Sequence, residues 1–197
     1  MENIDGLIES ANSLFLKKHF REAVPIYEKI LKIEPTNLTA INNKGYALSK
    51  SKDYENAINC YNHGLKIAPT EKSLLINKIS ALRKLKMLDM ALQNCDLFLD
   101  ENPNEFIVLY HKLRILRSLK KFDESLNICN KILNVYPNNG DVLFDKAENL
   151  AHLGKTSECL ESLKASIMIS TEFKIKAKNN ISFDVLRKNH QFLEIIR

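Results

Sequence analysis

The sequence has no tryptophan, and only five glycines and five prolines stand among its 197 residues. Folds made of many short strands need more turn residues than this, so the composition argues against a β-sandwich and favours long helices with short connections. No apolar run approaches the length of a membrane-spanning helix. The first ten residues, MENIDGLIES, also lack the basic start and the apolar core of a signal peptide.

Cysteine is scarce, and its spacing does not fit a metal site. There is no CxxC pair among the four residues Cys60, Cys95, Cys129 and Cys159. Each falls on the apolar side of a predicted helix, so we expect buried thiols with a structural role. Unpaired thiols suit a reducing compartment, and we therefore expect a cytoplasmic protein.

Catalytic signatures are missing too. The sequence contains no GxGxxG, P-loop, HExxH or GxSxG motif, and its five histidines are scattered without metal-ligand spacing. We predict that the protein is not an enzyme and uses no metal and no cofactor. The net charge of +5 is small and spread along the chain, so it demands neither nucleic acid nor a membrane surface.

Four of the five prolines follow a strict period. They are separated by 34 residues each and stand at Pro35, Pro69, Pro103 and Pro137. A period between about 20 and 50 residues is typical of a solenoid built from stacked repeats. Copies of the repeat then begin near Ile4, Leu38, Lys72, Phe106 and Gly140.

Small residues keep the same period in the second helix of each copy, and in the first helix of three copies at Ala11, Gly45 and Ala147, whereas Ile79 and Leu113 fill that place in the middle copies. Those in the second helix are Ala23, Ala57, Ala91, Ser125 and Cys159. The second copy also has Gly45 in its first helix and Tyr61 one turn after Ala57. This pattern resembles the tetratricopeptide repeat, in which a small residue in each helix is combined with an aromatic residue and a terminal proline. The family's tryptophan is replaced by Ile41, Leu75, Leu109 and Leu143 in copies two to five.

The resemblance implies an all-α, right-handed superhelical solenoid of about five helix-turn-helix repeats. We place the array at residues 1–171, with repeats near 4–37, 38–71, 72–105, 106–139 and 140–171. Residues 172–197 leave the pattern, and we expect them to form capping helices that cover the last repeat. In the first copy, Asn3 or Asp5 would cap the first helix, and Pro25 would lie in the first turn of a second helix from Glu22 to Glu34.

In this family the first helices line a concave groove that holds the ligand. The resemblance therefore implies the following partner-binding residues: Asn12, Asn42, Asn43, Tyr46, Asn77, Arg83, Tyr110, His111, Arg114, Arg117, Phe144, Asp145 and Glu148. Asparagine amides suit a peptide backbone, arginines suit carboxylates, and aromatic rings suit apolar side chains. A solvated helix face of ordinary composition is the alternative reading.

Some relatives bind chaperone tails through a clamp of two asparagines and three basic residues. Asn12 and Asn43 stand at the asparagine positions, but Ile8, Ser73 and Asn77 occupy the basic ones. Because the cations supply the attraction for carboxylates, we do not expect this mode of binding.

We predict a non-catalytic scaffold that binds a partner peptide or helix, and the basic middle of the groove favours an acidic one. The alternatives are a nucleic-acid-binding helical repeat that uses the basic middle and tail, or a self-associating structural module. We expect no membrane partner and favour a monomer, and the partner's identity stays open. Substituting Arg114 and Arg117 by glutamate is expected to abolish binding without changing the melting temperature.

Overall fold

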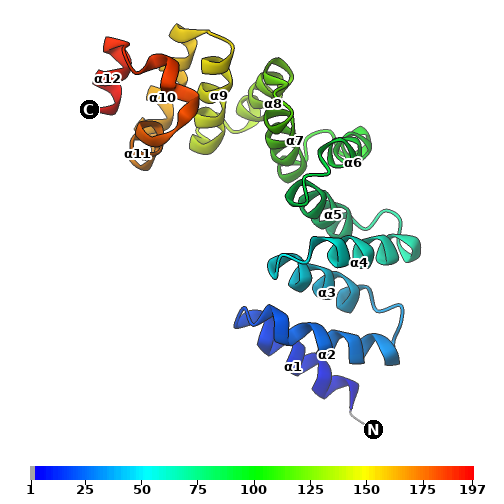
Figure 1. Cartoon of the computed structure of the whole chain (residues 1–197). Coiled ribbons are helices and arrows are strands. Elements are labelled where there is room, and N and C mark those ends of the chain that lie inside the picture. The colour runs from blue at the N-terminus through cyan, green and yellow to red at the C-terminus, as the bar shows by residue number, and fades with distance from the viewer. Residues whose placement is uncertain (1–2) are drawn as a thin grey trace. The chain divides into compact units, whose positions relative to one another are not determined.

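The computed structural model describes residues 3–197, and every regular element in that range is helical (Figure 1). The elements follow one another in the order α1 (Ile4–Leu16), α2 (Phe20–Ile33), α3 (Leu38–Lys50), α4 (Tyr54–Ile67), α5 (Lys72–Lys84), α6 (Leu88–Glu101), α7 (Phe106–Ser118), α8 (Phe122–Val135), α9 (Gly140–His152), α10 (Thr156–Ile169), α11 (Glu172–Asn179), the 3₁₀ helix η1 (Ile181–Leu186) and α12 (His190–Ile196).

The predicted repeat is confirmed in its helix starts. The odd-numbered helices α1 to α9 begin at the five positions that the 34-residue period marks. Asn3 is the residue that caps α1, because its side chain accepts a hydrogen bond from the backbone N–H of Asp5. The second helix of the first repeat begins at Phe20, two residues before the predicted Glu22. Pro25 therefore lies inside α2 and not in its first turn, which corrects the prediction.

The helices gather into two compact units, which meet in the chain between Glu101 and Asn102. The first unit holds α1 to α6 and the second holds α7 to α12. Within each unit, consecutive helices pack against each other. In the first unit, the α1–α2 and α3–α4 turns lie at one end of the helices, and the α2–α3 and α4–α5 connections lie at the other (Figure 1).

The closest packing in the second repeat occurs where α3 crosses α4. Tyr61 is almost completely buried, and Ala57 has no exposed surface. The ring of Tyr61 fits against Gly45, where a Cβ atom would come within 2.5 Å of the ring. Glycine is therefore needed at this point because the aromatic ring occupies the space that a side chain would take.

The turns inside the helix pairs share one backbone motif. In the first, the N–H of His19 donates to the carbonyl of Leu14 and the N–H of Lys18 donates to that of Phe15. These are the two bonds of a Schellman motif, which ends a helix with one residue in the left-handed conformation. The left-handed residues recur every 34 positions and have φ angles of 59° to 72°: Lys18, Lys52, Lys86, Lys120 and Gly154.

A lysine in this conformation is less favourable than a glycine, because its Cβ approaches the following carbonyl oxygen. We expect Lys86→Gly to raise the free energy of unfolding by about 1 kcal/mol, measured by urea denaturation. Lys84→Gly is the matched control inside α5, where glycine should lower the free energy by about 1 kcal/mol. Equal losses in both variants would contradict the strain at Lys86.

The second unit ends in the predicted helical cap. Phe183 and Phe192 have no exposed surface, and Leu186 and Ile196 are also buried. Of the predicted cap residues, Val185 is 74% exposed and does not take part in this core.

The second unit also contains a polar core. The amide of Asn149 donates to the hydroxyl of Ser125 at 2.9 Å, and that hydroxyl donates to the carbonyl of Leu113 at 3.2 Å. Neither polar side chain has any exposed surface. These bonds join α7, α8 and α9 at a level where the other repeats have apolar or small residues.

Candidate functional site

The first unit has a polar surface on helices α1, α3 and α5. The amide of Asn77 donates to the side-chain oxygen of Asn42 at 2.9 Å, and this bond links α5 to α3. The ring of Tyr46 packs against Phe15 with 5.3 Å between centroids. The sequence predicted that Asn42, Asn77 and Tyr46 share one surface; the hydrogen bond places Asn42 beside Asn77, and Tyr46 and Asn77 line the same hollow.

A hollow of about 240 Å³ opens between α3 and α5 at this surface. Two of the predicted residues line it, Tyr46 and Asn77, together with the hydroxyl of Ser80 and the lysines at the ends of both helices. We call it the α3–α5 hollow. Of the other residues predicted in this unit, Asn12 is exposed, whereas Asn43 and Arg83 are half-buried. The hollow combines hydrogen-bonding groups, cations and an aromatic ring in one open space.

The predicted residues of α7 form a smaller group in the second unit, in which Arg114 is exposed and the others are half-buried. Tyr110 stacks on Phe106, and the guanidinium of Arg114 lies 5.8 Å from the centre of the Tyr110 ring. Arg114 is exposed and His111 is half-buried. Burial raises the pKa of Tyr110, and nearby Asp145 raises it further, so this hydroxyl stays protonated near neutral pH.

Arg117 has a different environment because its guanidinium is bound inside the unit. It forms an ion pair with Asp145 and a second one with Glu148, in which Nη2 lies 2.6 Å from Oε1. Both carboxylates are buried on α9, with 7% and 6% of their surface exposed. The expectation that Arg117 can be replaced without effect on the melting temperature is therefore wrong, because its removal leaves two buried carboxylates without their cation.

Asp145 has a strongly shifted pKa. Burial, partly opposed by Arg117, raises the pKa of this carboxyl to about 7, and neighbouring Glu148 pushes it in the same direction. A carboxyl that titrates near neutral pH is often part of a functional site, but structural ion-pair networks have the same property.

The C-terminal cap uses the remaining polar groups of α9. The amide of Asn180 donates to Glu148 at 2.7 Å, and the imidazole of His152 lies 3.1 Å from the hydroxyl of Ser182. The ring of Phe144 stacks on Phe173 and is buried in the cap core. Of the predicted contacts, Phe144 and Glu148 are thus engaged with the cap and Asp145 with Arg117, and we do not include these three in the surface proposed below.

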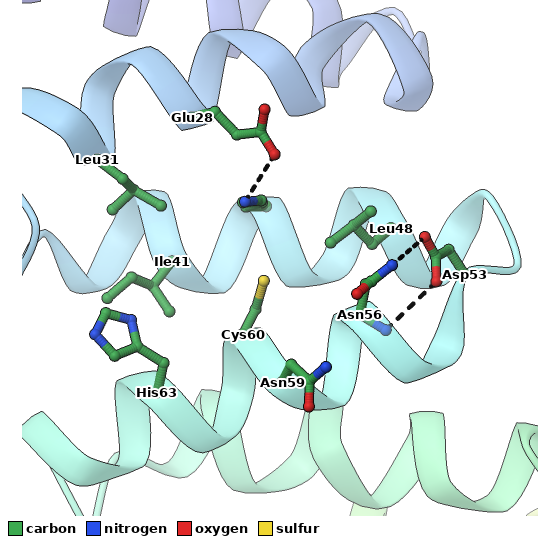
Figure 2. A pocket seen from close by; sticks show the side chains of 10 residues that line it. Glu28, Leu31, Ile41, Leu48, Asp53, Asn56, Asn59, Cys60 and His63 are labelled. Carbon is green, nitrogen blue, oxygen red and sulfur yellow. Dashed lines mark hydrogen bonds and ion pairs between the residues drawn. The ribbon is translucent and has the colours of Figure 1, made fainter.

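A larger pocket of about 500 Å³ opens among α2, α3 and α4 (Figure 2). The ammonium group of Lys44 forms an ion pair with the carboxylate of Glu28 across the pocket, at 2.9 Å. At one end of the pocket, the side-chain amide of Asn56 donates a hydrogen bond to the carboxylate of Asp53 at 2.9 Å. Asn59 and His63 line the pocket from α4.

The cysteines do not form a reactive centre. Cys95, Cys129 and Cys159 are buried, as expected, and Cys60 is half-buried against the pocket of Figure 2. Burial raises the pKa of Cys129 and Cys159 to about 12, which keeps both thiols protonated. Among residues 3–197, no three His, Cys, Asp or Glu side chains are grouped so that they could hold a metal ion.

Comparison with known proteins identifies one of the repeats by its sequence. The sequence pattern of the tetratricopeptide repeat matches residues 38–71, the copy that carries Gly45, Ala57, Tyr61 and Pro69. These residues are a tetratricopeptide repeat. No curated protein matches the full sequence.

Solved tetratricopeptide-repeat structures agree with this fold. MamA of Desulfovibrio magneticus RS-1, from residue 41 to its end, is 13% identical, with a TM-score of 0.80 over 87% of this chain and 97% of that one. YrrB, a tetratricopeptide-repeat protein with a peptide-binding site described as unusual, is 20% identical, with a TM-score of 0.72 over 91% and 93%. At these identities the likeness establishes the fold and nothing more.

One group of residues near these tetratricopeptide helices was missed by the sequence analysis. Cations gather at the turns inside the helix pairs, beside a hollow of about 470 Å³ that is lined by Lys18, Arg21, Lys50 and Lys52. The family pattern directs attention to the faces of the first helices and so leaves out their turns. A signal was nonetheless present in the sequence, in the repeated basic segments LKKHFR and SKSKD.

None of the helices in residues 3–197 is long and apolar enough to cross a membrane.

Proposed function

We infer that the protein is a non-catalytic scaffold that binds a peptide or helix of a partner protein. The α3–α5 hollow carries this proposal, because it combines the amide of Asn77 and the hydroxyl of Ser80 with the ring of Tyr46 in an open space. Amides and hydroxyls can bond a peptide backbone, and an aromatic ring can contact a side chain. The tetratricopeptide fold, whose members are typically interaction scaffolds, supports the same conclusion.

Half-buried Tyr110 and exposed Arg114 of the second unit extend the proposal. Both lie on α7, and Arg114 lines a hollow of about 340 Å³ together with the partly exposed Arg117, Lys120 and Phe122. We propose that partners contact each unit separately through such surfaces. A cytoplasmic location stays part of the proposal and rests on the four free thiols.

The pocket of Figure 2 is the second candidate for the peptide site. It is the larger hollow, and leucine and isoleucine side chains line it beside the Lys44–Glu28 ion pair. The two candidates can be separated by filling each one with a tryptophan side chain.

The test selects peptides from a displayed random library with the full chain and measures their affinity for three variants by calorimetry. Ser80→Trp fills the α3–α5 hollow, and we expect it to weaken the selected peptides about tenfold or more. Asn59→Trp fills the pocket of Figure 2, and Gln93→Trp changes an exposed residue of α6. Both should leave the affinity unchanged.

Loss of affinity in Asn59→Trp alone would move the site to the pocket of Figure 2. A library that yields no peptide binding the full chain above background would reject the proposed function.

A further inference from the structure

The end of the first unit that carries the α1–α2 and α3–α4 turns is rich in cations. The hollow of about 470 Å³ between these turns is lined by Lys18, Arg21, Lys50 and Lys52, all of them exposed. A single carboxylate shares the lining, that of Glu22, and the imidazole of His19 lies 3.3 Å from it. The hollow therefore has a clear excess of positive charge.

This basic hollow continues into the α3–α5 hollow. Lys50 and Lys52 line both of them, and the second one adds Lys84 and no carboxylate. Five cations and one carboxylate thus line a track that runs from the α1–α2 turn to the surface of α5. We call this track the basic track.

The backbone of the turns fixes the Cα positions of two of these lysines. Lys18 and Lys52 are the left-handed residues of their Schellman motifs, with φ angles of 62° and 69°. The paired hydrogen bonds of each motif fix the Cα atom from which the side chain leaves. The two lysine side chains therefore leave the backbone at fixed points on neighbouring turns.

We propose that the basic track binds an acidic peptide segment, with its carboxylates at the turn lysines and its backbone at the α3–α5 hollow. This inference rests on the proposed function and adds the chemistry of the ligand. The asparagine and serine groups of the α3–α5 hollow suit a peptide backbone, whereas a compact anion would need only the cations. The two joined hollows suit an extended ligand for the same reason.

A nucleic acid fits the track less well. Stacking of successive bases needs a series of free aromatic rings. Of the three tyrosines that line the α3–α5 hollow, Tyr61 is almost completely buried, and Tyr46 already packs against Phe15 and Phe20 with the Lys50 ammonium 5.0 Å from its centre, so Tyr54 is the one ring left. The positive charge alone does not distinguish the two polymers, so an oligonucleotide is one arm of the test.

The experiment measures the fluorescence anisotropy of a labelled peptide of alternating glutamate and serine with the full chain. The peptide is about 12 residues long and reaches about 40 Å when extended. We expect it to bind the wild type at about 0.15 M salt, and its glutamine version to bind about tenfold more weakly or not at all. A labelled single-stranded oligothymidine of equal charge is measured in parallel.

Two charge-reversal pairs separate the track from the overall charge. Lys18→Glu with Lys52→Glu changes the turns, and Lys32→Glu with Lys66→Glu changes exposed lysines at the opposite end of α2 and α4. Each pair removes two positive charges, adds two negative ones and repeats at the same 34-residue distance. The turn pair should weaken the acidic peptide about tenfold, and the opposite pair should change its affinity by less than about twofold. Thermal melts verify that both variants are folded.

Equal weakening by both pairs would overturn the proposal, because net charge alone would then explain binding. Tighter binding of the oligothymidine, lost in the turn pair, would also overturn it and assign the track to nucleic acid. If library-selected peptides bind through the α3–α5 hollow but the acidic peptide does not bind, the inference fails while the proposed function stands. An acidic peptide that is released by the turn pair and unaffected by Ser80→Trp would support the turn site and reject the α3–α5 hollow.

Discussion

Replacement of Arg117 by methionine is expected to lower the free energy of unfolding by about 3–5 kcal/mol at neutral pH. The guanidinium forms ion pairs with two buried carboxylates, those of Asp145 and Glu148. Without it, the side chains must either stay charged in a poorly solvated place or take up protons. Urea denaturation followed by circular dichroism measures the loss.

Arg114→Met is the matched control, since Arg114 lies on the same helix one turn earlier and is exposed. Its effect should stay within about 0.5 kcal/mol. Similar losses in both variants would show that the ion pairs of Arg117 contribute little.

The penalty for Arg117→Met should also depend on pH. Burial raises the pKa of Asp145 to about 7, above its ordinary value of 3.8, so the folded state binds more protons than the unfolded state between these values. This carboxyl therefore stabilises the fold at low pH and loses that contribution as the pH rises through about 7. Because a protonated carboxyl does not need the cation, the penalty should be smaller at pH about 5 than at pH about 8. A penalty that is independent of pH would contradict this account.

Substitution of Gly45 by alanine is expected to lower the free energy of unfolding by about 1–3 kcal/mol. The added methyl group would stand 2.5 to 3.0 Å from three carbon atoms of the buried Tyr61 ring, so helix α3 or the ring must shift. The loss should appear although alanine is the better helix former by about 1 kcal/mol. Thermal and urea unfolding of the purified variant measure it.

Gly6→Ala is its control within the same unit. Gly6 lies in α1, and no atom stands within 4 Å of the position that its Cβ would take. Here the helix preference acts alone, and we expect a gain of up to about 1 kcal/mol. If both glycine substitutions stabilised the protein, the close contact between α3 and α4 would be absent in solution.

The repeat could be predicted from the sequence because its physical causes are local. Prolines end the pairs at fixed intervals, and small residues such as Gly45 and Ala57 recur where helices cross, so the period and the helix starts were confirmed. The start of α2 was missed because neither His19, the residue before it, nor Phe20 is a typical capping residue. That error of two residues moved Pro25 from the first turn into the helix.

The site was harder to predict, because a family pattern says which way a side chain points and not what it meets. Arg117 and Asp145 stand at positions that the pattern turns toward a ligand, yet the fold pairs them with each other. Their pairing depends on how α7 packs near α9 in the second unit. The cap after α9 does not follow the repeat pattern, so the pattern could not predict this environment. The turn lysines were missed for the opposite reason, since the pattern gives their positions no role.

The polar core of the second unit has a consequence for exchanging repeats. The hydroxyl of Ser125 accepts a hydrogen bond from the side-chain amide of Asn149. The matching positions in the other repeats hold Ala23, Ala57, Ala91 and Cys159. A chimera that puts the second repeat in the place of the fourth would set Ala57 against Asn149 and leave a buried amide without that acceptor. The loss would be about 1–3 kcal/mol although the helices of both repeats begin and end at matching positions. The repeats are thus alike in geometry but not interchangeable, and Ser125 and Asn149 fix the order of the fourth and fifth.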